Sequence, residues 1–469
     1  MKKTAPLLSL PAPKMPPELE PAFRPPALFN RAFRKKAAST PGACPVGLVI
    51  EQADGSRFRF DTTVFPENGP EAALNFLHLE RMIKFLLWSR GGHRLHLSAP
   101  ADLTGRIQKH FADSKTGRFD ADIMGNRIYE KPFEVAACKP DELPVPRETT
   151  KPLGRHLKGC RIGFDLGASD RKVAALIDGE VVFSEETPWN PVVQADPQWH
   201  FDQIMHSLKR GAEHLPRVDA IGGSSAGVYV SNRVKVASLF RGVPADLFNT
   251  RVKNLFLELK AAWKQIPFEV VNDGEVTALA GSMSIGANSL LGIAMGSSEA
   301  GGYVTPEGNI TSWLNELAFA PVDYNPAAAA DEWSGDYGCG AQYFSQQAVG
   351  RLLAPAGIPT DPGMTLPVRL EHVQKLMKAG DPRAAAIYRT IGVYLGYAIA
   401  HYADFYPLRN LLVLGRVMTG DGGTMILEKA RAVLAKEFPE LAGQVAIHTP
   451  DEKMKRHGQA VAAASLPVA

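Results

Sequence analysis

The sequence predicts a mixed α/β protein whose main part begins near residue 160, with a small α+β domain ahead of it. After Cys160, short apolar runs and tight turns alternate with helical patterns, which is typical of an α/β architecture. Before it, a hairpin pattern is followed by one strong helix and a further strand. The length of 469 residues is enough for two or three domains, each with its own core.

The composition is that of an ordinary globular protein, with 45% hydrophobic and 22% charged residues. The formal net charge of +3 is too small to indicate a nucleic-acid partner. No apolar run approaches the length of a membrane helix. The four cysteines lie far apart without a Cys-x-x-Cys pair, which argues against a disulfide framework and against a structural zinc site. We therefore expect a cytoplasmic protein without a membrane partner.

The first 150 residues divide into two parts. Residues 1–42 are rich in proline and basic side chains, so we predict a mobile tail there. Residues 43–150 predict a small α+β domain of unknown role. Its hairpin turns at Asp54-Gly55, and its helix spans about residues 74–88 and ends at Gly91-Gly92. A proline-rich linker over residues 139–158 follows.

Strands and helices then alternate to the end of the chain. The predicted strands lie near residues 162–164, 172–177, 181–183, 218–221, 268–271, 290–295 and 411–414. The longest helical pattern runs over residues 384–405, with apolar residues on one face. A last helix rich in alanine ends near Ala464.

Three turns rich in small residues are candidate phosphate or nucleotide loops. The first is Gly163 to Ser169, in which Gly167 lets backbone N–H groups approach a phosphate, Ser169 adds a hydroxyl, and Asp165 ends a strand. A carboxylate such as Asp165 can hold Mg²⁺ directly or through water. An Asp-x-Gly turn is also a common hairpin device, so this alternative stays open.

The other two turns follow apolar strands. Gly296-Ser297-Ser298 joins two predicted strands, and Gly415-Arg416 follows the strand that ends at Leu414. The glycine of the second of these turns, Gly415, would let a flat base and its ribose lie against the backbone. Both turns could equally be ordinary glycine loops.

The order of these motifs resembles that of the actin–hexokinase superfamily. Asp165-x-Gly-x-Ser, Asn272-Asp273, Gly296-Ser297 and the Gly415 turn are similar to its first phosphate loop, catalytic aspartate, second phosphate loop and adenosine loop. Within it, residues 160–465 look most like the ROK family of bacterial sugar kinases and repressors. The segments that carry this likeness are Asn272–Ala280, Asn315–Phe319 and Gly335–Ser345.

This resemblance implies a two-lobed actin/hexokinase-like (ribonuclease H-like) fold. The first lobe would span residues 159–285 and the second residues 286–469, with the terminal helix packing back on the first lobe. It also implies a nucleotide site for ATP with Mg²⁺, formed by Asp165, Gly167, Ser169, Gly296, Ser297, Ser298, Gly415 and Arg416.

The same resemblance makes Asp273 the general base for a sugar hydroxyl. Asn272, Glu316, Ser225 and Gly227 are the candidate substrate ligands. From the residues alone, Asp273 could instead serve only as a helix cap, and Glu316 could be a surface carboxylate.

Several residues depart from the family pattern. Phe319 stands where the family has a histidine that binds sugar or zinc, and Ala341 stands where it has a sugar-binding glutamate. Glu332 and Ser334 stand where zinc-binding members have cysteines, so we predict no zinc. Glu299 places a carboxylate beside a candidate phosphate loop, which is electrostatically unfavourable unless it points away.

We therefore expect an ATP-dependent carbohydrate kinase with an alcohol group as acceptor. The alternative is a catalytically degenerate sensor or regulator of sugar or nucleotide. The expected partners are a small-molecule sugar, ATP and a second copy of the chain in a homodimer. Nucleic acid is not expected, because the first 150 residues lack a recognition helix.

Overall fold

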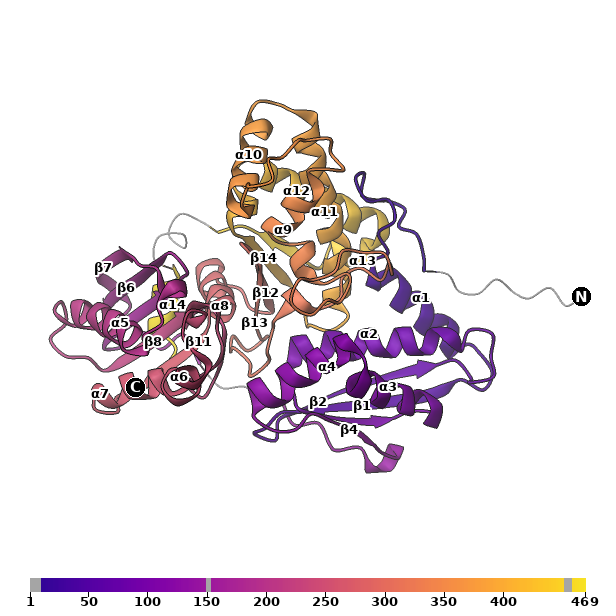
Figure 1. Cartoon of the computed structure of the whole chain (residues 1–469), viewed down its shortest axis with the longest axis horizontal. Helices are drawn as coiled ribbons and strands as arrows, with labels where there is room; N and C mark the ends of the chain where they lie inside the picture. The colour runs from indigo at the N-terminus through magenta and orange to yellow at the C-terminus, as the bar shows by residue number, and fades with distance from the viewer. Residues whose placement is uncertain (1–9, 149–152, 451–457) are drawn as a thin grey trace, which may run out of the picture.

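The computed structural model describes residues 10–148, 153–450 and 458–469, which form three bodies in contact (Figure 1). An N-terminal domain, drawn in violet, lies against the orange second lobe, and the magenta first lobe stands to one side. The structure confirms the predicted fold class: a small α+β domain precedes two α/β lobes. Within the described residues, no helix combines the length and apolarity needed to cross a lipid bilayer.

The N-terminal domain contains a four-stranded sheet in the order β2-β1-β3-β4. The strands are β1 (Cys44–Glu51), β2 (Arg57–Val64), β3 (Arg94–Ser98) and β4 (Glu134–Ala137). Between them lie α2 (Ala73–Arg90), α3 (Ala101–Asp113), α4 (Lys115–Ala121) and the π-helical segment η1 (Asp122–Tyr129). The β1–β2 hairpin turns at Asp54-Gly55, where Gly55 has a φ of 83° that favours glycine.

The prediction of a mobile tail over residues 1–42 is wrong for residues 10–42. Pro26–Ala38 form helix α1, and the preceding segment crosses helices of the second lobe. Phe23, Phe29 and Phe33 are all at most 2% exposed. Proline and basic residues suggested a solvated chain, but these spaced aromatic side chains pack against two bodies. Phe23 and Phe29 contact aromatic rings of the second lobe, whereas Phe33 contacts Phe65 and His78 of the N-terminal domain. Residues 1–9 lie outside the described part.

The first lobe is built on a five-stranded sheet in the order β11-β8-β5-β6-β7. Its strands are β5 (Cys160–Leu166), β6 (Asp170–Ile177), β7 (Glu180–Pro188), β8 (Ala220–Ser225) and β11 (Phe268–Asn272). Around it lie α5 (Pro197–Ala212), α6 (Ala245–Thr250), α7 (Leu255–Ala262), α8 (Asp273–Ile285) and a small hairpin of β9 (Val228–Val230) and β10 (Arg233–Val236). Strands β5, β8 and β11 are parallel, so their carboxyl ends lie at one edge.

The second lobe contains a sheet in the order β13-β12-β14-β15. These strands are β12 (Leu290–Met295), β13 (Glu299–Val304), β14 (Asn410–Leu414) and β15 (Ala446–His448). Its helices are α9 (Gln346–Leu352), α10 (Leu366–Lys378), α11 (Pro382–Ala403), α12 (Asp421–Glu437) and α13 (Pro439–Ala442). The predicted long helix over residues 384–405 corresponds to α11, which packs along α12.

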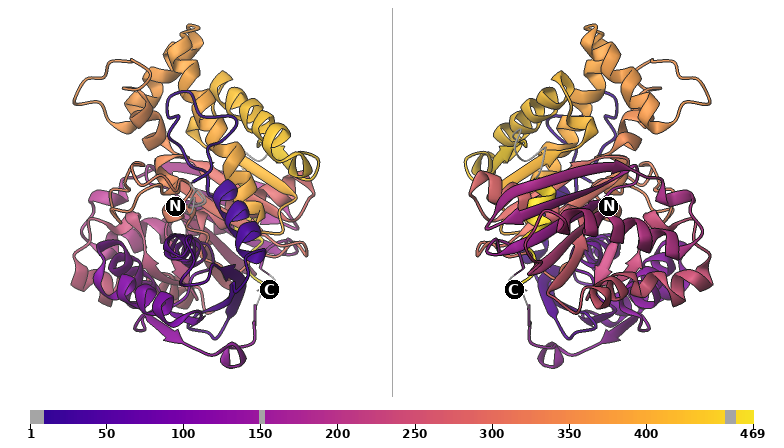
Figure 2. Two further views of the ribbon diagram at one scale, coloured as in Figure 1. Left: turned by 90° about the vertical axis from the view of Figure 1, so that its right-hand side faces the viewer. Right: turned by 90° about the vertical axis from the view of Figure 1, so that its left-hand side faces the viewer.

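The chain ends in helix α14 (Gln459–Ala464), drawn in yellow, which lies against the magenta strands of the first lobe (Figures 1 and 2). It contacts β5 and β8. A Cβ at Gly222 of β8 would lie 1.7 Å from the carbonyl oxygen of Ala463, and one at Gly163 of β5 would lie 1.8 Å from that of Ala460. The sheet therefore accepts this helix only because both strand positions lack a side chain. Residues 451–457 lie outside the described part.

We expect Gly222→Ala to lower the free energy of unfolding by about 1–3 kcal/mol, because the added methyl group displaces α14. Urea denaturation measures the change. Gly105→Ala is the control: this glycine lies within α3, where an added Cβ has no atom within 4 Å, so the variant should gain up to ~1 kcal/mol. Equal stability of the two variants would contradict the close packing of α14.

Candidate active site

Three strand ends of the first lobe bring the candidate residues of the site together. In the register of the sheet, Asp165 of β5 lies opposite Ser224 of β8, and Asn272 of β11 lies opposite Ser225. Ser224 Oγ donates a hydrogen bond of 2.6 Å to Asp165 Oδ1. Burial raises the pKa of Asp165, and the hydrogen bond from Ser224 opposes this. The parallel strands therefore place polar groups at one edge, as expected for a site of this architecture.

Asp273 is the first residue of α8. The helix is capped by its neighbour, because Asn272 Oδ1 accepts a hydrogen bond of 2.7 Å from Gly274 N–H. Asp273 Oδ1 also accepts from Gly274 N–H, at 3.0 Å. Burial and the nearby charge of Asp165 raise the pKa of Asp273 to about 6. A carboxylate with a pKa near neutrality is suited to exchange a proton with a substrate.

Asn272 links the first lobe to Glu316 of the second lobe. Its Nδ2 donates to Gly227 O at 2.7 Å and to Glu316 Oε1 at 3.4 Å. Burial and the charge of Asp273 raise the pKa of Glu316 to about 7. Three of the predicted substrate ligands, Asn272, Gly227 and Glu316, are thus in one hydrogen-bonded group.

Ser225 lies beside this group, but a neighbour already occupies its side chain. Ser225 is fully buried, and its Oγ shares a hydrogen bond of 2.7 Å with Tyr229 OH. Tyr229 OH also donates to Ala226 O at 3.1 Å. Sequence reasoning missed Tyr229, although an aromatic residue just after the small-residue loop was a signal.

The candidate phosphate loop of the first lobe is a tight turn. Gly167 N–H donates to Asp170 O at 3.0 Å, and Ser169 Oγ donates to Asp170 Oδ2 at 2.8 Å. Ser169 is exposed, so a ligand can reach its hydroxyl. Trp189 Nε1 donates to Gly167 O at 2.8 Å and holds the turn in place.

The other two loops meet in the second lobe. Gly296 N–H donates to Ser298 O at 3.0 Å, and Ser297 and Ser298 are exposed. Gly415 has a φ of 103°, and a Cβ there would lie 2.4 Å from Met295 O. The Gly415-Arg416 turn therefore packs directly against the strand that leads into the Gly296 loop.

Glu299 does not face the second phosphate loop. Its side chain points into the second lobe, where the residue is 3% exposed and Tyr402 OH lies 3.4 Å from Glu299 Oε1. Burial raises the pKa of Glu299 to about 8. This carboxylate is thus away from the turn, which removes the electrostatic conflict expected from the sequence.

Of the residues that replace the family's histidine and cysteines, Phe319 contacts the N-terminal domain and Ser334 is bonded within the second lobe. The Phe319 ring stacks on that of Trp88 of α2, with centroids 4.2 Å apart. Ser334 Oγ donates to Asp331 Oδ2 at 2.8 Å. An aromatic ring and a bonded hydroxyl are not zinc ligands, so these residues do not fit the metal.

A cavity of about 150 Å³ lies beside Asn272, Glu275 and Glu316. Its walls come from all three bodies of the protein: the β9–β10 hairpin and β11 of the first lobe, residues 310–314 of the second lobe, and the β1–β2 turn of the N-terminal domain. Glu275 had not been predicted. Its position on the first turn of α8, two residues after Asp273, was the available signal.

Comparisons with known proteins address the fold. No protein-family model matches this sequence, and no curated protein matches it. Among solved structures, it is similar to a ROK hexokinase from Thermus thermophilus, with a TM-score of 0.51 and 18% identity over 65% of this chain and 96% of that chain. It is also similar to a ROK family transcriptional regulator, a homologue of the E. coli MLC protein, with a TM-score of 0.53 and 19% identity over 66% of this chain and 78% of that chain.

The chain shares the two-lobed fold of these two proteins. At these identities the likeness is one of fold, since the same fold is found in a hexokinase and in a regulator. About a third of this chain lies outside the match to the hexokinase, although the hexokinase is covered almost completely. The chain therefore combines this fold with additional sequence.

Proposed function

We propose that the protein is an ATP-dependent kinase that phosphorylates a hydroxyl group of a sugar or sugar derivative, with Asp273 as the general base. The observation that supports this most is the position of Asp273: it starts α8 beside the bonded pair Asn272 and Glu316, and its pKa of about 6 leaves it ionised at neutral pH. The two exposed hairpin turns, one in each lobe, are suited to hold the phosphates of ATP.

In the proposed reaction, Asn272 and Glu316 form hydrogen bonds with hydroxyl groups of the substrate. Asp273 takes the proton of the attacking hydroxyl, the substrate oxygen forms a bond to the γ-phosphorus, and the bond to the β-phosphate oxygen breaks to release ADP. The site is at a boundary between lobes, so water can be excluded while the reactants are held in line.

Mg²⁺ fits the donor set of the site. Asp165 and Asp273 are neighbouring acidic groups, and the charge of Asp165 raises the pKa of Asp273. A positive ion beside them would favour the ionised carboxylates. Asp165 would hold the ion directly or through water, together with phosphate oxygens. The ion would neutralise phosphate charge during the transfer.

A sensor or regulator without turnover is the second candidate. It is favoured by Phe319, which lies against Trp88 rather than at the cavity, and by Ala341, which is 2% exposed and has no polar group for a sugar. The fold likeness to a transcriptional regulator agrees with either function.

Incubation with Mg²⁺-ATP and a panel of sugars separates the two candidates. We expect ADP release that depends on one class of sugar, with a phosphorylated product identified by mass spectrometry. Saturable sugar binding without any product would support the sensor instead. Binding of neither sugar nor ATP would rule out both.

A further inference from the structure

The N-terminal domain supplies one wall of the cavity that holds Asn272 and Glu316. Gln52, Ala53 and Asp54 line it from the tip of the β1–β2 hairpin, and Tyr129 lines it from the end of η1. These residues belong to a domain that precedes the two-lobed part of the chain. The shape and charge of the cavity are therefore not determined by the two lobes alone.

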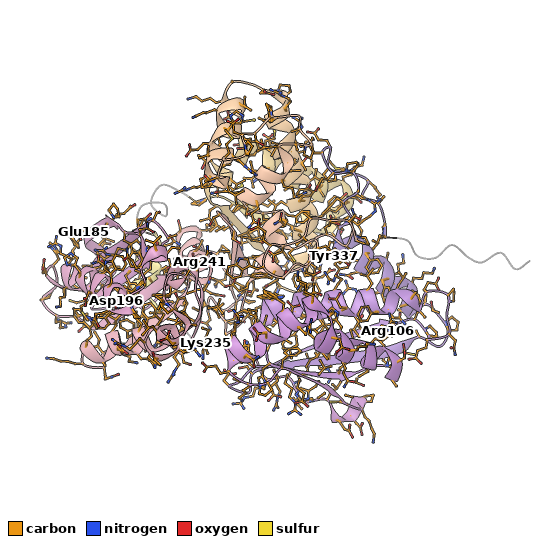
Figure 3. The ribbon with its side chains drawn as sticks, viewed as in Figure 1. Arg106, Glu185, Asp196, Lys235, Arg241 and Tyr337 are labelled. Atoms are coloured by element: carbon orange, nitrogen blue, oxygen red, sulfur yellow. The ribbon has the colours of Figure 1, made fainter. Side chains whose placement is uncertain are left out.

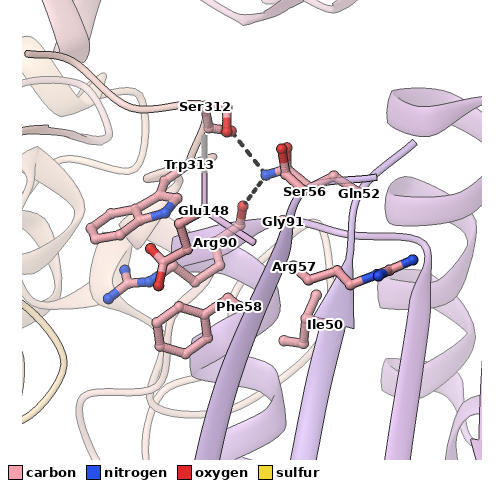
Figure 4. Close-up of a pocket in the computed structure, with 10 residues that line it drawn as sticks. All are labelled: Ile50, Gln52, Ser56, Arg57, Phe58, Arg90, Gly91, Glu148, Ser312 and Trp313. Carbon is pink, nitrogen blue, oxygen red and sulfur yellow. Dashed lines mark hydrogen bonds between the residues drawn. The ribbon is translucent and has the colours of Figure 1, made fainter. Parts of the chain in front are cut away.

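This wall is held in place from both sides. Gln52 Nε2 donates hydrogen bonds of 2.7 Å to Arg90 O and 2.9 Å to Ser312 O of the second lobe (Figure 4). Glu130, which follows η1, pairs with Lys235 at 2.9 Å and Lys253 at 3.0 Å in the first lobe. Lys235 lies on the side of the first lobe that faces the N-terminal domain (Figure 3). The wall is thus pre-organised, as a specificity element requires.

The charged residues around the cavity all have one sign. Among the described residues that line it, the acids are Asp54, Glu269, Glu275 and Glu316, and none is Lys, Arg or His. Two cations contact lining residues without being among the lining residues themselves. Arg90 lies 3.6 Å from the centre of the Trp313 ring, and Lys131 donates to the carbonyl of Ala53 at 3.3 Å. The cavity therefore disfavours an anionic ligand, such as a sugar acid or sugar phosphate.

One of these acids is buried without full compensation. Glu275 is 5% exposed, and Asn315 Nδ2 donates to its Oε1 at 2.5 Å. Burial raises the pKa of Glu275 to about 8, although Asn315 and the backbone of Tyr303 favour its ionised form. Within the described residues, Oε2 accepts no hydrogen bond of ordinary geometry. Near pH 7 this carboxyl is therefore mostly neutral, and a positively charged ligand beside it would favour its ionised form.

We propose that the cavity selects a hydroxylated substrate that carries a protonated amine, such as an amino sugar, and that the N-terminal domain contributes to this selection through Asp54. The inference deepens the proposed kinase function and rests on it for the meaning of the cavity. An ammonium group donates three hydrogen bonds. It also brings a positive charge beside Glu275, Glu316 and Asp54, which have no cation among the other lining residues. A neutral hydroxyl supplies the donors without the charge.

Calorimetric titration without ATP tests the proposal. The probes are glucosamine, galactosamine and mannosamine, each compared with its neutral parent hexose and its N-acetyl derivative at one pH and low salt. We expect at least one amine to bind about tenfold more tightly than both neutral forms, because charge-assisted hydrogen bonds are roughly twice as strong as neutral ones. Equal or weaker binding of all three amines, or no binding of any probe, would overturn the proposal.

Variants distinguish the contribution of the N-terminal domain to amine preference from that of the two lobes. Asp54→Asn keeps the oxygen that accepts Ser56 N–H at 2.9 Å, so the turn is retained, and the preference for the amine should fall about two- to fivefold. Glu275→Gln should lower it about tenfold. Asp61→Asn is the control, because this exposed carboxylate of the same hairpin pairs with Arg59 and is not among the cavity residues. An unchanged preference in Asp54→Asn would exclude a role of the N-terminal domain.

These measurements do not depend on turnover. Amine-selective binding without a phosphorylated product would support the inferred selectivity and argue against the kinase function. Phosphorylation of neutral sugars with no preference for amines would keep the kinase and remove the inference.

Discussion

The Asp273→Asn variant should lose about 10²–10⁴-fold in kcat, with a much smaller change in KM. The amide keeps the size of the side chain and can still accept from Gly274 N–H, but it cannot take a proton from the substrate hydroxyl. Asn272 caps α8, so the helix should remain folded in the variant. Steady-state rates with Mg²⁺-ATP and the sugar that gives product in the panel measure the loss.

The pH dependence gives this prediction a second readout. The base works when ionised, and the pKa of Asp273 is about 6 because of burial and the nearby Asp165. In the wild type, kcat/KM should therefore rise with pH through about 6 and level off above it. The residual activity of Asp273→Asn should lack this rise.

An exposed acid is the matched control. Asp113 lies at the end of α3 on the surface, and Asp113→Asn should keep the wild-type rate and pH profile. A rate for Asp273→Asn within a factor of two of wild type would show that Asp273 is not the base. Its role would then be only that of an acidic residue in the first turn of α8.

Asp336→Ala should lower the free energy of unfolding by about 3–5 kcal/mol, which is the usual cost of removing one partner from a buried ion pair. The Arg81, Lys84 and Asp336 side chains are 3%, 1% and 2% exposed. Arg81 Nη2 lies 2.9 Å and Lys84 Nζ 3.1 Å from Asp336 Oδ2. Without this carboxylate, the two cations of α2 share Asp120 and Glu80 but lose their partner in the second lobe.

Removal of the Asp336 carboxylate should also affect the candidate site. Helix α2 holds the segment before Phe319, since Trp88 O accepts from Glu316 N–H at 2.9 Å and Ser89 O accepts from Asn315 N–H at 3.0 Å. The ring of Tyr337, seen at the boundary of the two bodies in Figure 3, stacks against the Arg81 guanidinium, 4.7 Å from its centre. We therefore expect weaker sugar binding in Asp336→Ala as well as lower stability.

Urea denaturation with the Asp102→Ala variant as control tests this prediction. Asp102 is 72% exposed and lies 4.0 Å from Arg106, so its removal should cost no more than about 0.5 kcal/mol. Burial alone would raise the pKa of Asp336, but Lys84 and Arg81 outweigh it and lower the pKa to about 2. The pair therefore contributes stability above the ordinary value of 3.8 and loses it as the pH falls through about 2. Equal losses in the two variants would contradict a special role of the buried cluster.

The main elements of the fold could be predicted because they follow from local pattern. The Asp54-Gly55 turn, the helix that ends at Gly91 and the strands before Asp165 and Asp273 are each set by residues within a few positions. The order of three glycine turns and two acids was enough to suggest a two-lobed architecture, and the structure confirms it. The individual roles of these site residues stay predictions.

The errors and omissions arose where distant segments meet. The tail prediction over residues 10–42 was wrong because composition does not show which partners the aromatic side chains find. Phe23 and Phe29 pack against rings of the second lobe, and Phe33 packs against Phe65 of the N-terminal domain. The direction of Glu299 was open for the same reason, since a strand end can place a side chain toward a loop or into a core.

By itself, the sequence determined the class of the fold, the strand ends that carry Asp165 and Asn272-Asp273, and the glycine turns, since turn geometry and strand–helix periodicity are local properties of the chain. Only the tertiary structure decided that an N-terminal hairpin closes the cavity, that Glu275 is buried beside it without a full set of donors, and that Arg81 and Lys84 meet Asp336. Burial and the charge around a carboxylate depend on contacts between residues far apart in sequence, and those contacts exist only once the three bodies have packed together.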